Sequence, residues 1–310
     1  MNCSKPRVVA VVGPTASGKT ALAIELAKRL DGEVISCDSM QIYKGMDIGT
    51  AKPTPEETCG IPHHMIDIVE PCESFSAADY APLAKACADD IIRRGKLPIF
   101  CGGTGLYLDS VLTANEYADV ETDLNLRASL LADAERDGAD ALWQRLNEVD
   151  PESAAATHKN NVKRVARALE IYLSSGVTKT EWDKRSRESP PPFDQTIIAL
   201  DRLRDELYSR IDRRVDIMME SGLENEVRQL LDSGRLPRNS TAAQAIGYKE
   251  LIAYFDNAVT KDEAIFAIKQ SSRRYAKRQL TWFRRNSDVK WIISDPNFEV
   301  IVNIALKLLT

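Results

Sequence analysis

An eight-residue segment near the N-terminus, Gly13–Thr20, has residue types and spacing that suit a phosphate group. It reads GPTASGKT and fits the pattern G-x-x-x-x-G-K-[ST] at every fixed position. In such a loop the backbone N–H groups and the positive end of the following helix attract an anion, and Lys19 adds a point charge. The Thr20 hydroxyl suits a Mg²⁺ ion. The pattern predicts a phosphate-binding loop, and it leaves open whether a nucleotide or another phosphorylated substrate occupies it.

Two further segments carry polar groups that could act beside this loop. Asp38 follows the apolar run VISC, and its carboxylate could bind a metal, act as a general base, form a turn or cap a helix. The segment Gly102–Gly105 reads GGTG, and its glycines permit backbone geometry that is closed to other residues. Thr104 would present a hydroxyl there. Taken alone, this segment is equally compatible with a simple turn.

The segment Arg273–Arg285 concentrates positive charge in a chain whose net charge is −5. It reads RRYAKRQLTWFRR and contains six basic residues and no acidic one. Guanidinium groups suit phosphates, and aromatic rings suit stacked bases. The segment therefore predicts either a nucleic-acid contact or an amphipathic helix with an aromatic core face. The negative net charge argues against a large nonspecific nucleic-acid binder.

The six cysteines all lie in the first third of the chain, and none forms a C-x-x-C pair. Cys59, His63, His64 and Cys72 are close in sequence, but their spacing matches no standard zinc site. Reduced, mostly buried cysteines are expected. No apolar run approaches the roughly 20 residues that a membrane-spanning helix needs, and the first residues lack the apolar stretch of a secretory signal. We expect a cytoplasmic protein with no membrane partner.

The elements that must position these groups alternate between strands and helices. Apolar runs predict strands over residues 8–12, 33–37, 97–101, 196–200 and 291–294, and amphipathic patterns predict helices over 20–30, 77–94, 205–222 and 261–285. This alternation implies a parallel sheet whose functional loops lie at the carboxyl ends of the strands. Because Gly13–Thr20, Asp38 and Gly102–Gly105 all follow strands, we expect them to meet in one crevice.

The segment from about Asn115 to Pro192 differs from the rest of the chain. It is polar, charged and helix-patterned, and it closes with the rigid sequence SPPPF. We therefore predict an α/β fold with a P-loop parallel sheet core flanked by helices, formed by residues 1–114 and 196–310. Residues 115–195 are predicted to form a mainly helical insertion domain.

Several segments, taken together and in order, resemble the tRNA dimethylallyltransferases, also called tRNA isopentenyltransferases. They are GPTASGKT, ISCDSMQIYKGMDIGTAKP, IPHHMIDI, GGTGLYLDSVL, VKRVARALEIY, LYSRIDRRVDIMMESGLENEV, AIGYKELIAY and RRYAKRQLTWFR. The resemblance extends from Val8 to about Arg285, and the combination of GPTASGKT with DSMQIY and a late GYKEL is highly specific. Since no zinc-finger spacing follows these segments, a bacterial-type member is expected.

The resemblance implies transfer of a dimethylallyl group from dimethylallyl diphosphate to N6 of an adenosine. The target is the adenosine immediately 3′ of the anticodon, in tRNAs that read codons beginning with U. The phosphate loop would hold the diphosphate of the donor, and no nucleotide would be spent. N6 is a poor nucleophile, so the reaction needs a stabilised leaving group, an oriented amine and a carboxylate for its proton. The adenine must also be extruded from the anticodon loop, as in other enzymes that act on a stacked base.

The resemblance also implies roles for particular residues. Asp38 would accept the N6 proton, and Thr104 would help to place the amine. The diphosphate, with Mg²⁺ on Thr20, would be bound by Gly13, Thr15, Ala16, Ser17, Gly18, Lys19, Thr20 and Arg214. Contacts to tRNA would come from Ser39, Met40, Gln41, Lys163, Arg164, Arg167, Gln244, Gly247, Tyr248, Lys249, Arg274 and Arg278. The expected partners are the anticodon stem-loop of tRNA and dimethylallyl diphosphate, and the expected oligomeric state is a monomer.

One segment departs from the family pattern. The run His158–Arg164 reads HKNNVKR, where family members carry two prolines, and Lys163 replaces the usual glutamine. Arg164 and Arg167 keep the positive charge. The altered run puts the turn geometry and any glutamine-specific base contact in question.

Three other functions compete with tRNA prenylation. An adenylate isopentenyltransferase, acting on free AMP, would need neither the insertion nor the GYKEL segment. A P-loop small-molecule kinase should contain an adenine-binding segment, and none is identifiable in the sequence. A non-enzymatic RNA-binding module would have no use for an intact phosphate loop.

Overall fold

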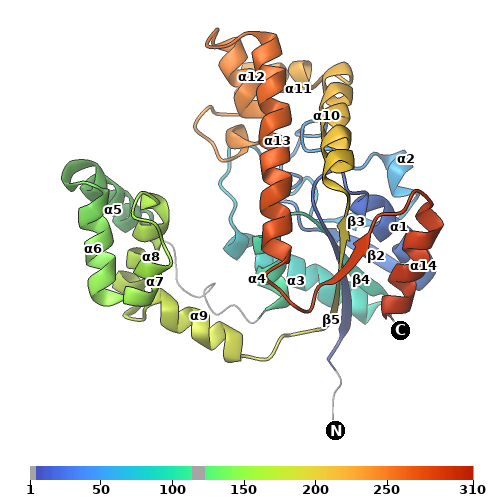
Figure 1. Cartoon of the computed structure of the whole chain (residues 1–310), viewed down its shortest axis with the longest axis horizontal. Coiled ribbons are helices and arrows are strands. Elements are labelled where there is room, and N and C mark those ends of the chain that lie inside the picture. Colours follow the sequence, from blue (N-terminus) through green and yellow to red (C-terminus); the bar gives the residue numbers. More distant parts are fainter. Residues whose placement is uncertain (1–4, 114–122, 310) are drawn as a thin grey trace. The chain divides into compact units, whose positions relative to one another are not determined.

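A six-stranded parallel sheet forms the centre of the larger of two compact units (Figure 1). The fold was determined as a computed structural model, which describes residues 5–113 and 123–309. The larger unit comprises residues 1–112 and 193–310, and the smaller unit comprises residues 113–192. The strands, in chain order, are β1 (Arg7–Val12), β2 (Gly32–Ser36), β3 (His63–His64), β4 (Leu97–Gly102), β5 (Asp194–Asp201) and β6 (Lys290–Ile293).

The order across the sheet is β3-β2-β4-β1-β5-β6, so β1 lies between β4 and β5. Val9 is opposite Ile99 on one side and Thr196 on the other. Val8–Val12 are fully buried, as expected for the central strand of a parallel sheet that is covered on both faces. The continuous apolar run in the sequence follows from this position.

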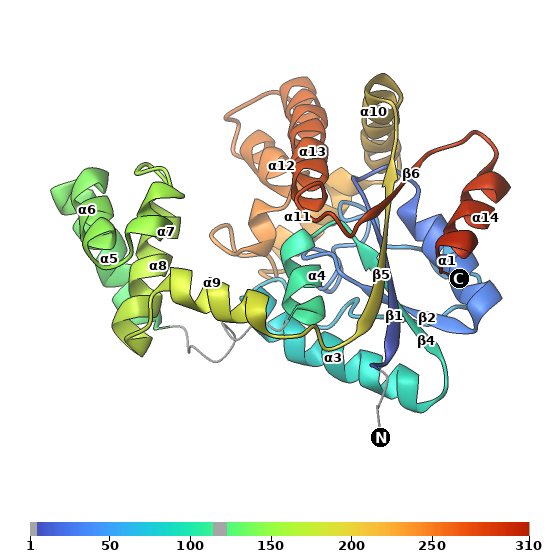
Figure 2. The same ribbon diagram turned by 60° about the horizontal axis from the view of Figure 1, so that its bottom comes forward.

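Helices cover both faces of the sheet (Figure 2). Because successive side chains of a strand point to opposite faces, Val8, Ala10 and Val12 pack with α3 (Ala77–Arg93) and α4 (Gly105–Leu112). Val9 and Val11 pack instead with α1 (Lys19–Leu30) and α14 (Phe298–Leu309). The short helix α2 (Pro55–Thr58) precedes β3.

A group of helices follows β5 and forms a third apolar cluster with the segment after β2. These helices are α10 (Arg204–Glu220), α11 (Leu223–Asp232), the 3₁₀ helix η2 (Ala242–Gln244), α12 (Tyr248–Phe255) and α13 (Lys261–Phe283). Their buried side chains surround Ile42, Tyr43 and Met46. A capping box at Thr260 begins α13. The Thr260 hydroxyl accepts from the backbone N–H of Glu263, and the Glu263 carboxylate accepts from the backbone N–H of Thr260. The segment after β2 is thus held by helices from the far end of the chain.

The smaller unit is helical throughout its described residues. It contains α5 (Leu124–Asp137), α6 (Ala139–Val149), α7 (Pro151–Ala155), α8 (Val162–Ser175) and α9 (Lys179–Glu188). Its core is formed by side chains such as Leu130, Leu146, Val165 and Leu169. The buried carboxylate of Glu170 also lies in this unit, where arginines neutralise it.

The predicted α/β class, with a parallel sheet and flanking helices, is confirmed. The sequence did not indicate β3, because a strand of two residues is too short to show a pattern. The smaller unit ends at Pro192, three residues before the predicted boundary, and the predicted start at Asn115 lies outside the described residues. Among residues 5–113 and 123–309, no helix combines the length and apolar character that a membrane crossing requires.

Candidate active site

The phosphate loop joins β1 to α1 in a conformation that requires glycine at both of its fixed positions. Gly13 has φ +146°, and a Cβ there would lie 2.7 Å from the carbonyl oxygen of Leu200 on β5. Gly18 has φ +99°, in the left-handed region that favours glycine. The hydroxyl of Ser17 is buried and forms no hydrogen bond within the described chain. An orphan hydroxyl of this kind is unusual in a folded protein.

Two cations beside this loop lack a carboxylate partner among the described residues. Burial lowers the pKa of the Lys19 ammonium, and the Arg214 guanidinium lowers it further. Among residues 5–113 and 123–309, the Lys19 ammonium donates a hydrogen bond only to the carbonyl oxygen of Pro14, at 3.4 Å. Burial also lowers the pKa of Arg214, whose guanidinium reaches the Thr15 hydroxyl at 3.4 Å. Since charges removed from water are normally paired, these two partly buried cations provide a site for an anion.

Asp38, which follows the carboxyl end of β2, lines a cavity with a volume of about 300 Å³, and Thr104, which follows β4, contacts Ser39 in the wall of that cavity. The Asp38 carboxylate accepts one hydrogen bond, from the Met40 N–H at 2.9 Å, and makes no other within the described residues. Thr104 is fixed by its N–H, which donates to the Cys37 carbonyl at 3.2 Å. Its hydroxyl accepts from the Ser39 N–H at 3.1 Å. The Asp38 carboxylate therefore lies in the cavity with Lys19, and the Thr104 hydroxyl is hydrogen-bonded to Ser39 beside it.

Helix α13 contributes an aromatic wall to this cavity. Tyr275 lines it, forms a side-chain hydrogen bond with Thr104, and has its pKa raised to about 12, mainly by burial. The Arg278 guanidinium lies 5.5 Å from the centre of the Tyr275 ring and also lines the cavity. The segment Arg273–Arg285 therefore packs Phe283 into the core and places Arg278 at the cavity, and its contact with nucleic acid stays a prediction.

Comparison with known proteins identifies the family to which this chain belongs. The sequence matches the IPP transferase family over residues 41–286 and the isopentenyl transferase family over residues 6–68. It is 50% identical over 296 residues to the tRNA dimethylallyltransferase of Halalkalibacterium halodurans, covering 95% of this chain and 94% of that one. It is 50% identical over 315 residues to the tRNA dimethylallyltransferase of Bacillus subtilis, covering 99% of each. The chain belongs to the tRNA dimethylallyltransferase family.

Solved structures agree with this assignment. The crystal structure of the full-length tRNA isopentenylpyrophosphate transferase from Bacillus halodurans is 47% identical, with a TM-score of 0.73, and covers 98% of this chain and 97% of that one. A eukaryotic dimethylallyltransferase, described as acting on tRNA, is 29% identical, with a TM-score of 0.83, and covers 98% of this chain and 78% of that one. The predictions of the family and of an enzyme, a tRNA prenyltransferase, are confirmed.

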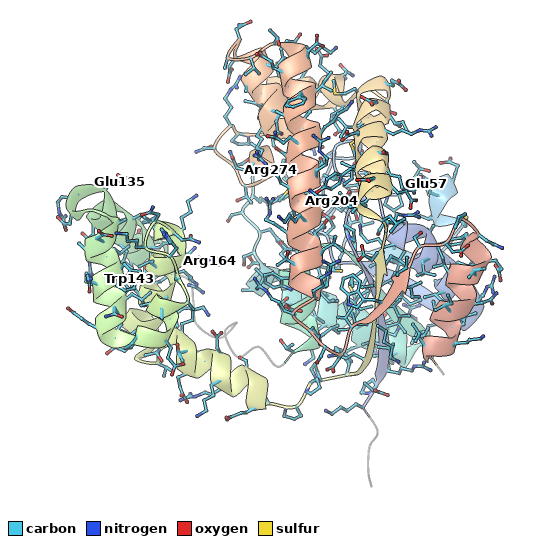
Figure 3. All side chains as sticks on the ribbon, in the orientation of Figure 1. Glu57, Glu135, Trp143, Arg164, Arg204 and Arg274 are labelled. Atoms are coloured by element: carbon cyan, nitrogen blue, oxygen red, sulfur yellow. The ribbon has the colours of Figure 1, made fainter. Side chains whose placement is uncertain are left out.

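The candidate tRNA contacts other than Tyr248 fall into three groups. One group lines the cavity and consists of Ser39, Met40, Gln41, Gln244, Gly247, Lys249 and Arg278. Arg274 is exposed on α13, as Figure 3 shows. The third group, Lys163, Arg164 and Arg167, belongs to α8 in the smaller unit.

Three of these candidates are already engaged inside the protein. The Gln41 side-chain oxygen accepts from the Ser36 hydroxyl at 2.8 Å, and its nitrogen donates to the backbone carbonyls of Thr50 and Ala51. Arg167 bonds to the buried Glu170 at 2.6 Å. The Gln41 and Arg167 side chains therefore hold parts of the protein's own chain in place.

Tyr248 is the third such candidate, and its predicted role as an RNA contact needs correction. Its side chain is fully buried, and its hydroxyl donates to Glu226 at 2.5 Å. The Glu226 carboxylate also accepts from the backbone N–H groups of residues 47, 48 and 49, at 2.9, 2.7 and 3.1 Å. Tyr248 therefore supports the wall of the cavity from behind and has no side-chain surface to offer to RNA.

The sequence reasoning missed two arginines that lie against the phosphate loop. The side-chain Nε groups of Arg202 and Arg210 donate to the carbonyl oxygens of Ser17 and Ala16, each at 3.0 Å. Arg210 stands one helical turn before Arg214 on α10, so the same face of the helix carries both. That spacing, in the segment LYSRIDRR, is the signal that could have identified Arg210.

The cysteine and histidine residues between 59 and 72 do not assemble a metal centre. Cys59 and Cys72 are exposed free thiols, and His64 bonds to Glu33 at 2.8 Å. In the part of the chain that the structure describes, no group of three His, Cys, Asp or Glu side chains could hold a metal ion. His63 instead lines the cavity beside the phosphate loop.

Proposed function

We propose that this dimethylallyltransferase moves a dimethylallyl group from dimethylallyl diphosphate to N6 of the adenosine 3′-adjacent to the anticodon. The acceptors are tRNAs that read codons beginning with U. The observation that supports the proposal is one cavity in which two partly buried cations, Lys19 and Arg214, lie with the carboxylate of Asp38 and form no ion pair with any described residue. The cations would bind the diphosphate, and the carboxylate would accept a proton from the amine that displaces the diphosphate.

The phosphate loop would bind the diphosphate and stabilise it as it leaves. As the bond between the allylic carbon and the diphosphate oxygen breaks, negative charge collects on that oxygen. Lys19, Arg214 and the N–H groups at the start of α1 already point positive charge at this site, so stabilisation costs no rearrangement. Gly13 and Gly18 keep the backbone in the required shape, and Ala16 and Ser17 complete the loop.

The residues of the loop also fit a Mg²⁺ ion. Asp38 is the one carboxylate among the described residues that line the cavity, and the Thr20 hydroxyl lies there too. Mg²⁺ typically keeps several waters and substrate phosphate oxygens, with few protein ligands, which matches so sparse a set of protein oxygens. Thr20 would hold the ion, which when bound would neutralise part of the charge of the diphosphate.

Asp38 and Thr104 would act on the amine. The N6 nitrogen forms its new bond to the allylic carbon, and one N6 proton passes to the Asp38 carboxylate. The backbone N–H of Met40 fixes one oxygen of that carboxylate, and the other is left for the substrate. Thr104, held between Ser39 and Cys37, would orient the amine by hydrogen bonding.

The tRNA would be held by the cavity-lining and exposed basic residues already described, including Lys163 and Arg164 on the smaller unit. Because tRNA is the acceptor, we place the enzyme in the cytoplasm. We also infer that it acts as a monomer, since one chain supplies both the cations and the carboxylate. Free AMP is disfavoured as acceptor, because the relatives of high identity are named for tRNA. A kinase activity is not favoured either.

The test combines the purified protein, Mg²⁺, dimethylallyl diphosphate and an anticodon stem-loop with adenosine at the target position. Mass spectrometry should detect one added prenyl group, and free AMP should compete poorly. Asp38→Asn should lower the rate of the chemical step by about 10³-fold, a typical contribution of a general base. Asp89→Asn, a change at an exposed aspartate of α3, serves as the control. ATP hydrolysis without prenylation would contradict the proposal.

A further inference from the structure

Gln279 on α13 lies between the phosphate loop and the loop that carries Thr104. Its side chain is buried, with only 4% of the residue exposed. The side-chain oxygen accepts from the backbone N–H of Thr15 at 2.9 Å, and the side-chain nitrogen donates to the carbonyl oxygen of Gly103 at 3.0 Å. An N–H requires an acceptor and a carbonyl requires a donor, so only this orientation of the amide satisfies both loops.

The two loops joined by this amide hold the two halves of the proposed reaction. Thr15 belongs to the phosphate loop, where the leaving group would bind. Gly103 immediately precedes Thr104, whose hydroxyl accepts from Ser39 N–H, the neighbour of Asp38. Hydrogen bonds and the Gly103–Thr104 peptide bond thus connect the phosphate loop, through Gln279, to the residues that would hold the amine.

This link has little room to deform. A Cβ on Gly103 would lie 1.9 Å from the Gln279 side-chain nitrogen, and a Cβ on Gly105 would lie 2.2 Å from the ring nitrogen of Trp282. The Trp282 ring N–H donates to Asp109 on α4 at 2.9 Å. Helix α13 therefore packs directly against the backbone from Gly103 onward, and glycine is needed at two positions for that approach.

The same contact changes what Thr15 contributes. Its N–H is taken by Gln279, so Thr15 has only its hydroxyl, which contacts Arg214, to offer toward a diphosphate. The remaining N–H donors of the loop belong to the residues closer to α1. The amide of Gln279 thereby marks the end of the anion site.

We propose that Gln279 is a positioning residue that sets the separation between the leaving diphosphate and the attacking amine. This proposal depends on the proposed function. Transfer requires the two reacting atoms in near-attack contact, and a displacement of about 1 Å can cost about 10²-fold in rate. Breaking the link leaves both half-sites in place but lets their separation vary, so binding survives while the chemical step slows.

Gln279→Met, which keeps the side-chain length and removes both hydrogen bonds, tests this directly. We expect the single-turnover rate at saturating substrates to fall by about 50-fold. The Kd values for dimethylallyl diphosphate and for the stem-loop, measured separately, should stay within about threefold of wild type. Gln270→Met is the matched control, because Gln270 lies on the same helix and its side chain makes no hydrogen bond within the described residues. Its rate should equal that of wild type.

Gln279→Glu supplies a second readout that a purely structural role would not produce. An ionised carboxylate can accept from Thr15 but cannot donate to Gly103, whereas a protonated one can do both. Its single-turnover rate, divided by the wild-type rate at each pH, should therefore rise at least fivefold between pH 8 and pH 5.5. This variant also decides the matter if Gln279→Met fails to fold.

The outcomes separate the two proposals. If wild type makes no prenylated stem-loop, the proposed function fails. If wild type is active and Gln279→Met reacts within threefold of it, the positioning role is overturned. A rate loss matched by an equal loss of substrate binding also overturns it, as does a pH-independent ratio for Gln279→Glu.

Discussion

Two clusters of charge in the larger unit, both largely removed from solvent, are built in opposite ways. Glu33 on β2 has a side chain that is 3% exposed, and it is surrounded by basic side chains. Arg94 bonds to it at 2.7 Å, His64 at 2.8 Å and Lys96 at 3.2 Å. The Arg94 hydrogen bonds hold the pKa of Glu33 well below its usual value. At the phosphate loop, by contrast, the buried charges are cations without a carboxylate partner among the described residues.

This difference shows where the charges of the protein are paired with one another and where they depend on a ligand. Glu33 stands near the amino end of β2, and Asp38 follows the carboxyl end of the same strand. In open α/β sheets, ligands bind outside the carboxyl ends of the strands. The amino end is satisfied by the protein itself, so changes there should affect stability. The carboxyl end is left positive, so changes there should affect catalysis.

Lys19→Met should show the largest effect, and it tests the catalytic role of the cations at the phosphate loop. We expect the single-turnover rate to fall by about 10³-fold, because a preorganised charge at the leaving group is lost. The melting temperature should stay the same or rise, since the variant no longer buries an unpaired ammonium. Lys28→Met, at an exposed lysine on the same helix, is the control. A rate within tenfold of wild type would show that Lys19 is not part of the anion site.

Arg214→Met should reduce the rate less, by about 10²-fold, and should raise the KM for dimethylallyl diphosphate. Arg214 approaches the loop from α10 and shares the anion with Lys19 and the loop N–H groups, so its loss is partly covered. Arg213→Met changes the adjacent exposed arginine and should leave both constants unaltered. Equal effects of the two substitutions would point to general electrostatic attraction instead of a specific contact.

Glu33→Gln should give the smallest functional effect and the clearest loss of stability. The variant removes the carboxylate that Arg94 and Lys96 share, so we expect the melting temperature to fall by roughly 5 °C, with the prenylation rate within twofold of wild type. Thermal unfolding followed by circular dichroism, with the rate measured in parallel, provides the check. A large loss of activity without a loss of stability would reverse the comparison.

The difference in stability between wild type and Glu33→Gln should depend on pH, and this dependence tests whether charge causes it. Because the pKa of Glu33 is lower in the folded protein than its ordinary value of 4.5, its ionised form stabilises the fold. The stability gap between wild type and Glu33→Gln should be full above pH 4.5 and should shrink as pH falls below it. A gap that persists unchanged to pH 3 would show that charge is not its origin.

The phosphate loop, Asp38 and Thr104 could be predicted from the sequence because each directly follows a short apolar strand. Parallel strands bring their carboxyl ends to one edge, so three positions in the sequence specified one site. Gln279 could not be predicted in the same way, since it reaches Thr15 across 264 residues. Its partner depends on how α13 packs on the sheet, and no local pattern carries that information.

Tyr248 shows the converse limit. An aromatic residue in an amphipathic helix can face a core or a stacked base, and the sequence pattern is the same for both. The packing of α11 and α12 placed this ring inside the protein against Glu226. Arg167 is a similar case, because the pairing with Glu170 depends on one helical turn of α8 in a unit that also brings Arg127 to the same carboxylate.

The position of β1 between β4 and β5 has a consequence for synthesis of the protein on the ribosome. β1 and its neighbour β4 are complete once Gly102 has been translated, but the neighbour on the other side, β5, begins only at Asp194. At translation rates of about 5–20 residues per second, the intervening roughly 90 residues take about 5–20 s to appear. During that interval the apolar edge of Val8–Val12 has no strand to pair with and offers a template for aggregation. We therefore expect nascent chains stalled before Asp194 to bind chaperones, and chains stalled after Asp201 to bind them less.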